Sequence, residues 1–360
     1  MAPVVIALRR NPRYRTVLVS TSQHGAMLGQ ALDAFGISPD IDLELKRTDS
    51  SLEGFLASAL VPLGHVMSDL RPTMTLVQGD TMTVLAAAQA AFFQRVPVGH
   101  IEAGLRSYDM DQPFPEEANR RLTSVLAGYH FAPTAGARDN LVREGIDPNR
   151  IWVTGNTGVD ALGHLRFTSP VDERIAAIDF DGKRVILLTA HRRENHGKPL
   201  ADICNAVRDI VRDFPDVDVV VPVHANPAVK VVMHAILGDL DRVHLLPPLD
   251  YKDLVYVLRR CTLVLTDSGG IQEDAPSCDA PVLILREVTE RPEVVECGAG
   301  LLVGTARKSI VAAVRMLLTD DDALAAMANA RNPFGDGRAS DRIVRVIGES
   351  FERRLAVRVS

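Results

Sequence analysis

The sequence has no excess of basic residues and few cysteines, and these two deficits exclude several classes of function. Its 360 residues include 40 Lys and Arg against 46 Asp and Glu, which gives a formal net charge of −6. Nucleic acid is not expected as a partner, because a nucleic-acid footprint is strongly basic. The four cysteines show no CxxC spacing and no zinc pattern. We therefore expect reduced thiols in a cytoplasmic protein that binds no metal.

Long apolar runs and the common cofactor motifs are also missing. No apolar run reaches the ~18 residues of a membrane-spanning helix, so no membrane partner is expected. The longest candidate, residues 84–93, predicts a buried helix, and Pro3 is typical of a first helical turn. The N-terminus places apolar residues before charged ones, the reverse of a secretory signal. There is no Walker loop, GxGxxG fingerprint or HExxH motif, and GNTG (155–158) has too few glycines, so no cofactor is predicted.

What the chain does have is an alternation of strand-like apolar runs with helical stretches. The runs are continuous, as expected for parallel strands that are covered on both faces. The pattern predicts an α/β fold with two Rossmann-like domains, whose parallel sheets face each other across a cleft. A segment with little strand character separates two series of runs, and we place the linker near residue 165. The expected strands are 16–20, 73–78, 96–101, 129–133 and 151–155, then 184–189, 217–223, 243–247, 262–266, 281–285 and 300–304.

Polar segments occur where several of these strands should end. In open α/β sheets, ligands bind at the carboxyl ends of the strands. Acids, a histidine, arginines and a glycine-rich turn all follow strands, which indicates a nucleotide-binding site with acid/base chemistry. The segments are VQGDT (77–81), HIEAGLRS (100–107), PFPEEANRR (113–121), TAHRREN (189–195), VPVHANP (221–227) and DSGGIQEDAP (267–276).

The segment DSGGIQEDAP predicts a phosphate site followed by a ribose site. Ser268, Gly269 and Gly270 open a helix after a buried strand, and glycines let a phosphate approach the backbone closely. An alternative is a plain helix cap, in which Asp267 or Ser268 satisfies backbone donors. Glu273 and Asp274 suit hydroxyl groups better than phosphates, and a ribose diol fits them.

Basic side chains after neighbouring strands support the diphosphate interpretation. Arg291 in TERPE (289–293) is expected at the same edge as the glycine turn, and Arg286 is a second candidate. His191 follows a buried strand and can donate to a phosphate or protonate a leaving group, although a merely structural histidine is the alternative. His224 has the same place after its strand.

The first domain contributes carboxylates. Asp80, Glu102, Glu116 and Glu117 are expected in loops after strands, where crowding and burial raise the pKa of carboxyl groups. Such groups can serve as general base and general acid near neutrality. For Glu117 we favour the alternative of an ordinary first helical turn after Pro115.

Together, GDT, HIEAGLRS, PFPEEANR, HRREN, DSGGIQE and TERPE resemble the motifs of the non-hydrolysing UDP-N-acetylglucosamine 2-epimerases, over nearly the whole chain. The resemblance implies a GT-B fold with a C-terminal helix that returns to the first domain. Residues 1–164 with 345–360 would then form one domain, and 165–344 the UDP-binding domain. It also implies a homodimer that interconverts UDP-N-acetylglucosamine and UDP-N-acetylmannosamine.

The resemblance also implies a mechanism, in which UDP is eliminated to give 2-acetamidoglucal and then adds back. By their positions in the motifs, Asp80, Glu102 and Glu116 are the acid/base residues, and His191 acts near the phosphates. Which carboxylate removes the C2 proton stays open. The implied substrate-binding residues are Arg120, Arg192, His224, Ser268, Gly269, Gly270, Glu273, Asp274 and Arg291.

Three positions depart from the family pattern. Asp274 stands where a ribose-binding glutamate is usual. The regulatory segment QHREM reads QHGAM here, so Gln23 and His24 remain but substrate activation is expected to be weak. The family has a strand and a GTRPEAIK loop before MAP, whereas this sequence starts at Met1. We therefore expect low stability and activity of the 360-residue chain, and restored activity in a version extended upstream.

Three alternatives to the epimerase remain open from the sequence. A hydrolysing epimerase would release free N-acetylmannosamine, and a related enzyme would act on a UDP-diacetamido sugar. EAGLR and PEEANR favour the non-hydrolysing kind. A nucleotide-sugar-binding protein with weak catalysis is the alternative of a different class.

Overall fold

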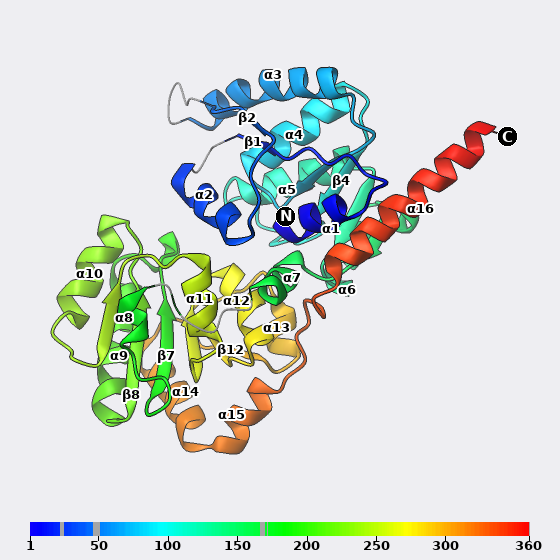
Figure 1. Cartoon of the computed structure of the whole chain (residues 1–360). Coiled ribbons are helices and arrows are strands. Elements are labelled where there is room, and N and C mark those ends of the chain that lie inside the picture. The colour runs from blue at the N-terminus through cyan, green and yellow to red at the C-terminus, as the bar shows by residue number, and fades with distance from the viewer. Residues whose placement is uncertain (22–24, 46–50, 166–169, 171, 360) are drawn as a thin grey trace. The chain divides into compact units, whose positions relative to one another are not determined.

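The computed structural model of the chain describes residues 1–21, 25–45, 51–165, 170 and 172–359. They form two compact units, Met1–His164 with Phe334–Ser360, and Leu165–Pro333 (Figure 1). The chain enters the second unit at the expected linker. It returns to the first unit at Phe334, before residue 345, where the return was expected.

The first unit contains two parallel sheets. Its elements are α1 (Ala2–Arg10), β1 (Val19–Ser20), α2 (Gly25–Ala34), β2 (Ile41–Asp42), α3 (Leu52–Leu70), β3 (Thr75–Gln78), α4 (Met82–Phe93), β4 (Val98–Ile101), α5 (Glu116–Leu126), β5 (Tyr129–Ala132), α6 (Ala135–Arg143), η1 (Pro148–Arg150), β6 (Ile151–Val153), α7 (Thr157–His164) and α16 (Ala339–Val359). Four strands pair in the order β3-β4-β5-β6, and β1 pairs with β2 in a separate sheet. Helices α3 and α4 pack around Val77 and Val98, whereas α1 and α16 pack around Ile101 and Phe131. The four-stranded sheet is thus covered on both faces.

The second unit contains one parallel sheet of six strands. Its elements are α8 (Glu173–Ala176), β7 (Arg184–Thr189), η2 (Arg193–Asn195), α9 (Lys198–Asp213), β8 (Val217–Pro222), α10 (Pro227–Leu237), β9 (Val243–Leu246), α11 (Tyr251–Leu258), β10 (Leu263–Thr266), α12 (Gly269–Asp274), η3 (Ala275–Cys278), β11 (Val282–Ile284), α13 (Pro292–Glu296), β12 (Gly300–Leu302), α14 (Arg307–Thr319) and α15 (Asp321–Ala328). The order is β12-β11-β10-β7-β8-β9, so the chain runs outward from β7 and then restarts at β10. Strands β7 and β10 are neighbours at this switch point, where doubly wound sheets bind ligands.

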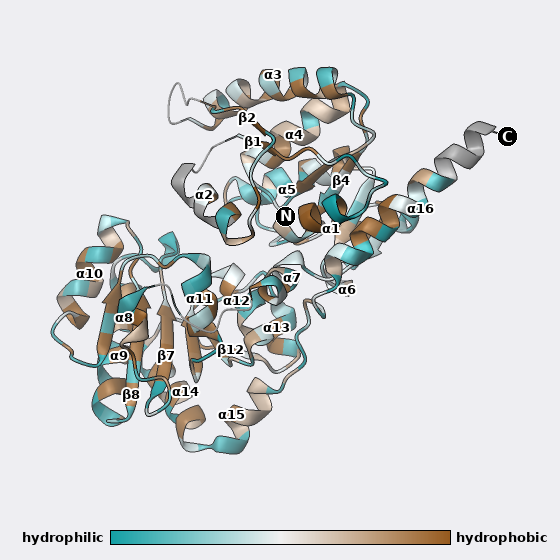
Figure 2. Cartoon of the chain, in the orientation of Figure 1, coloured by the Kyte–Doolittle hydropathy of each residue, from teal (hydrophilic) through white to brown (hydrophobic). Residues whose placement is uncertain are grey.

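The expected strands are all confirmed, and every strand pair between them is parallel. Figure 2 shows the strands of the second unit as apolar segments, in line with their continuous runs of Val, Leu and Ile. Two details differ from expectation. The two-residue strand β2 was not expected, because it has no apolar run. The helix expected to be buried is α4, but Phe92 and Phe93 in its last turn are 55% and 65% exposed.

The described helices include none that is long and apolar enough to cross a membrane.

Candidate active site

Asp80 and Glu102 lie at one edge of the first unit's sheet because their strands are neighbours. The last residues of β3 and β4, Gln78 and Ile101, are paired in register; Glu102 follows Ile101 directly, and Asp80 follows Gln78 after one glycine. Glu102 has a left-handed backbone with φ 63°, which is costly for a residue with a side chain and clusters at functional sites. Gln78 Nε2 donates to Glu102 Oε1 at 2.6 Å. This bond fixes the orientation of the carboxylate.

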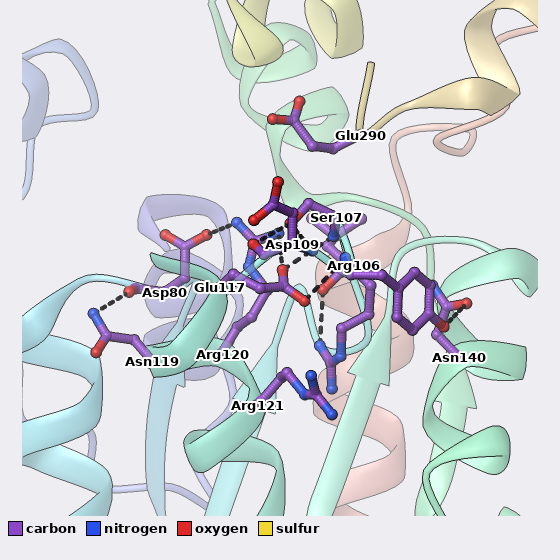
Figure 3. A network of polar contacts seen from close by, with 12 residues as sticks. Asp80, Arg106, Ser107, Asp109, Glu117, Asn119, Arg120, Arg121, Asn140 and Glu290 are labelled. Atoms are coloured by element: carbon purple, nitrogen blue, oxygen red, sulfur yellow. Dashed lines mark hydrogen bonds and ion pairs between the residues drawn. The ribbon is translucent and has the colours of Figure 1, made fainter. Parts of the chain in front are cut away.

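Asp80 is held by two residues of α5. Arg120 Nη2 donates to Asp80 Oδ2 at 2.5 Å, and Asn119 Nδ2 donates to the Asp80 carbonyl at 2.9 Å (Figure 3). The Arg120 side chain is only 8% exposed and also lies 3.3 Å from Glu117. We expected Arg120 to bind substrate, and in the structure its guanidinium pairs with these two carboxylates.

Glu116 and Glu117 both lie in the first turn of α5, but their surroundings differ. Glu117 is fully buried, and its carboxylate accepts N–H bonds from Ser107 at 3.0 Å and Tyr108 at 3.3 Å (Figure 3). Glu116 is half-buried, and among the described residues no hydrogen bond or ion pair engages its carboxylate. Glu117 therefore anchors the loop after β4 and is more than a residue of a first helical turn, whereas the carboxylate of Glu116 is available for chemistry.

His100 on β4 supports the turn that presents Asp80. Its Nε2 lies 2.8 Å from the carbonyl oxygen of Gly79, a residue with φ 82° that only glycine adopts easily. His100 is completely buried and pairs in register with buried His130 on β5. Burial lowers the pKa of both imidazoles from 6.5 to about 4. Both rings are therefore neutral in the folded protein at neutral pH.

These two histidines predict a loss of stability in mild acid. Below pH 6.5 the two histidines bind protons in the unfolded chain, but in the folded protein they bind them only near pH 4. The free energy of unfolding is therefore highest above pH 6.5 and falls as the pH drops below that value. The expected loss is about 1 kcal/mol per histidine between pH 6.5 and 5.5. Urea denaturation of the wild type and of His130→Phe at several pH values measures it. His130→Phe is expected to make the free energy of unfolding depend less on pH. His65→Gln, at an exposed position, is the control and is expected to keep the wild-type pH dependence. Equal slopes in the wild type and both variants would contradict this origin of the pH dependence.

In the second unit, the candidate residues of the segments HRREN and SGG follow β7 and β10 at the switch point. Thr189 and Thr266, the last residues of these strands, are paired in register, and their hydroxyls lie 2.6 Å apart. Thr266 Oγ1 also accepts the Ser268 N–H at 2.9 Å. These bonds fix the start of the segment SGG beside the segment HRREN.

Asp267 does not cap the helix that follows it, which contradicts one alternative from the sequence. Its carboxylate is fully buried and accepts the N–H groups of His191 and Arg192, each at 2.9 Å. Ser268 is the N-cap residue of α12, but its side chain makes no capping bond. Asp267 thus joins the loop after β10 to the loop after β7.

Arg291 lies against the glycine turn. Its Nε donates to Glu273 Oε1 at 2.6 Å, and a Cβ added at Gly269 would lie 2.6 Å from its Cζ. Burial alone would raise the pKa of Glu290, but bonds from Arg286 and the charge of Arg291 hold it at about 2. Arg286 also binds Glu194 at 2.7 Å, so it links the segments HRREN and TERPE.

If the glycine turn binds UDP, as the resemblance implies, Gly269→Ala should weaken that binding by about tenfold or more, which corresponds to ~1.4 kcal/mol. The new methyl group must displace the Arg291 guanidinium, whose flexible stem moves with little loss of stability. Gly270→Ala is the matched variant, because no atom lies within 4 Å of a Cβ added there. Calorimetric titration with UDP measures both affinities. Equal losses would show that the backbone itself, and not Arg291, sets the affinity.

The other candidate residues fall as follows. His191 and His224 stack with ring centroids 5.2 Å apart, and Arg192 is half-buried in the loop after β7. Asp274 Oδ2 accepts from the Tyr251 hydroxyl at 3.4 Å. Gln23 and His24 lie outside the described residues. Among the described residues, no group of His, Cys, Asp and Glu is arranged to hold a metal ion.

Sequence reasoning missed the roles of four residues. Gln78, His100 and Asn119 lie within or beside the motifs, but their partners are set by strand pairing and by the packing of α5. Asp267 directly follows a strand, as Glu102 does, so the same rule would have found it. The missed residues hold the candidate side chains in position.

Comparisons with known proteins identify the family. The family model described as UDP-N-acetylglucosamine 2-epimerase matches residues 6–348. The UDP-N-acetylglucosamine 2-epimerase of Bacillus subtilis is 46% identical, over 96% of this chain and 90% of that protein. The Escherichia coli K12 enzyme of the same name is 44% identical, over 96% of this chain and 94% of that protein.

Solved structures agree with the sequence comparisons. The crystal structure of the UDP-GlcNAc 2-epimerase from Neisseria meningitidis, bound to UDP-GlcNAc, superposes with a TM-score of 0.91 at 41% identity. The superposition covers 97% of this chain and 96% of the Neisseria meningitidis chain. The expected α/β fold of GT-B type, with a Rossmann-like sheet in each unit, is thereby confirmed. This chain is an enzyme that belongs to the UDP-N-acetylglucosamine 2-epimerase family.

Proposed function

We propose that this enzyme interconverts UDP-N-acetylglucosamine and UDP-N-acetylmannosamine without a cofactor, by elimination and re-addition of UDP. The observation that supports it most is the pair Asp80 and Glu102, brought to one sheet edge with Glu102 in a left-handed backbone. A base removes the C2 proton while the C1–O bond to UDP breaks, which leaves 2-acetamidoglucal. UDP then adds back to C1 as a proton is delivered to the opposite face of C2.

The proposed roles follow from the surroundings of each residue. Asp80, Glu102 and Glu116 exchange the C2 proton, and among them Glu116 has the carboxylate that no described residue engages. The leaving diphosphate gains negative charge, which positioned cations and hydrogen-bond donors stabilise. Arg291, held by Glu273 against Gly269, and His191, beside buried Asp267, are suited to that task.

Proton NMR of the reaction with UDP-N-acetylglucosamine tests the proposal. The expected product is a mixture of the two UDP-sugars at equilibrium, with no free UDP accumulating. Free N-acetylmannosamine with stoichiometric UDP would instead indicate a hydrolysing epimerase. An unchanged spectrum that shows only binding would indicate a nucleotide-sugar-binding protein, and turnover only of a UDP-diacetamido sugar would identify the related enzyme.

We further propose that the enzyme is a homodimer through an apolar surface on α4 and α5. The C-terminal halves of these packed helices expose Phe92, Phe93, Leu122 and Val125, and Val125 is 77% exposed. Contiguous exposed apolar surface marks interaction sites. A second copy of the chain would cover them.

Val125→Asp is expected to turn the dimer into a monomer, because two charges would be buried at the interface without partners. Val231→Asp on α10 is the matched control, since Val231 is 68% exposed and belongs to the second unit. Sedimentation velocity measures the mass of each variant. A wild type that sediments as a monomer, or a Val125→Asp variant that sediments as a dimer, would contradict this interface.

A further inference from the structure

Asp267 is surrounded by hydrogen-bond donors that come from one loop. Besides the N–H groups of His191 and Arg192, its Oδ2 accepts from Asn195 Nδ2 at 2.9 Å. The side chain is completely buried, so water does not compete for its oxygens. These bonds stabilise the negative charge of the carboxylate. His191 Nδ1 lies 3.6 Å from Asp267 Oδ1, so the carboxylate is the charged group beside this ring nitrogen.

The stacked partner of His191 has its proton on the other ring nitrogen. The N–H of Asn226 donates to His224 Nδ1 at 3.1 Å, so Nδ1 has a free lone pair and the proton of the neutral ring is on Nε2. In His191 the carboxylate of Asp267 faces Nδ1 and favours a proton there. The two rings are nearly parallel, with 10° between their planes.

We propose that Asp267 is a positioning residue that fixes His191 as the Nδ1–H tautomer, so that His191 and His224 form a stacked pair with opposite tautomers. His224 Nε2–H is then a permanent hydrogen-bond donor, whereas His191 Nε2 is the nitrogen that gains or loses a proton. The pair suits a diphosphate, since it offers one fixed donor and one that becomes a cation on protonation. The diphosphate as ligand rests on the proposed function, but the tautomers do not.

The charges around His191 agree with this division of roles. Burial lowers the pKa of His191, and Asp267 opposes that effect, while His224, Arg192 and His196 add to the lowering. The free enzyme therefore holds His191 mostly neutral at neutral pH. An anionic diphosphate beside Nε2 would favour the protonated ring, so UDP binding is expected to draw one proton from solvent onto His191.

Long-range proton–nitrogen NMR of the ¹⁵N-histidine-labelled full chain reads both tautomers directly, with signals assigned through His191→Gln and His224→Gln. In the wild type we expect Nδ1–H for His191 and Nε2–H for His224 at pH 8. In Asp267→Asn we expect His191 to shift toward Nε2–H while His224 is unchanged. The limb of the pH–rate profile that reports the titration of His191 should shift in this variant. Its kcat should fall about 10- to 100-fold, as for other residues that orient a histidine.

The matched control is Asp218→Asn. Asp218 Oδ2 lies 2.9 Å from His244 Nε2, which makes another Asp–His pair in the same unit, but at the amino end of β8. That variant should change the His244 signal and leave the pH–rate profile as in the wild type.

A wild type in which both site histidines have the same tautomer would overturn the proposal without any variant, so it stays testable if Asp267→Asn does not fold. An Asp267→Asn protein whose His191 keeps the wild-type tautomer and titration would also overturn it, even if activity fell. Opposite tautomers in a wild type that does not epimerise UDP-N-acetylglucosamine would support this inference and refute the proposed function.

Discussion

Glu102→Gln is expected to lower epimerase turnover by roughly 10²-fold or more, the usual scale for a general acid or base. Gln keeps the shape of the side chain and its contact with Gln78, but it cannot exchange the C2 proton. We expect losses of the same size for Asp80→Asn and Glu116→Gln. UDP affinity should change little, because these side chains belong to the first unit and UDP is assigned to residues of the second.

Initial rates and calorimetric titration with UDP measure the two effects separately. Glu53→Gln is the matched control, because Glu53 is an exposed acid in the first turn of α3, in the same unit. Wild-type turnover in any of the three acid variants would remove that residue from the proposed chemistry. A parallel loss of UDP affinity would mean that the acids act on binding and not on proton transfer.

Glu117→Gln is expected to destabilise the protein by about 3–5 kcal/mol, the usual cost of breaking a buried ion pair. The amide has one oxygen where the carboxylate has two, and Ser107, Tyr108 and Arg120 donate to or pair with those two oxygens. Domains are stable by only ~5–15 kcal/mol, so the loss should be plain in a melting curve.

Glu116→Gln provides the matched comparison, since the two residues are neighbours on α5 and differ in burial. We expect Glu116→Gln to lose activity. Its free energy of unfolding should lie within ~0.5 kcal/mol of the wild-type value, as is usual for a substitution that breaks no buried contact. Denaturant midpoints of both variants and the wild type decide the matter. A Glu117→Gln protein as stable as the wild type would show that the loop after β4 does not depend on this anchor.

The strands could be predicted from sequence because each buried strand is a continuous apolar run ended by polar residues. The same rule predicted that Asp80, Glu102, His191 and Ser268 follow strands. It failed for β2, which has no apolar run. It also failed for Phe92 and Phe93, because the composition of their helix predicts burial although its last turn is exposed.

The pairing of side chains could not be predicted, because it depends on contacts between residues far apart in the sequence. The sequence predicted Glu117 to be an ordinary acid of a first helical turn. Its partners are backbone N–H groups of the loop after β4, and only the fold brings that loop to Glu117. Asp267 and His191 are separated by 76 residues and meet because β7 and β10 are neighbours at the switch point. The strand order that creates the switch has no local signature.

The reaction in heavy water tests the central claim most directly. If UDP-N-acetylglucosamine is epimerised by removal and return of the C2 proton, deuterium from the solvent enters at C2 of both UDP-sugars. Proton NMR should show the C2 signal disappear as epimerisation proceeds, with no added cofactor. Epimerisation that requires added NAD and leaves the C2 proton in place would contradict the account.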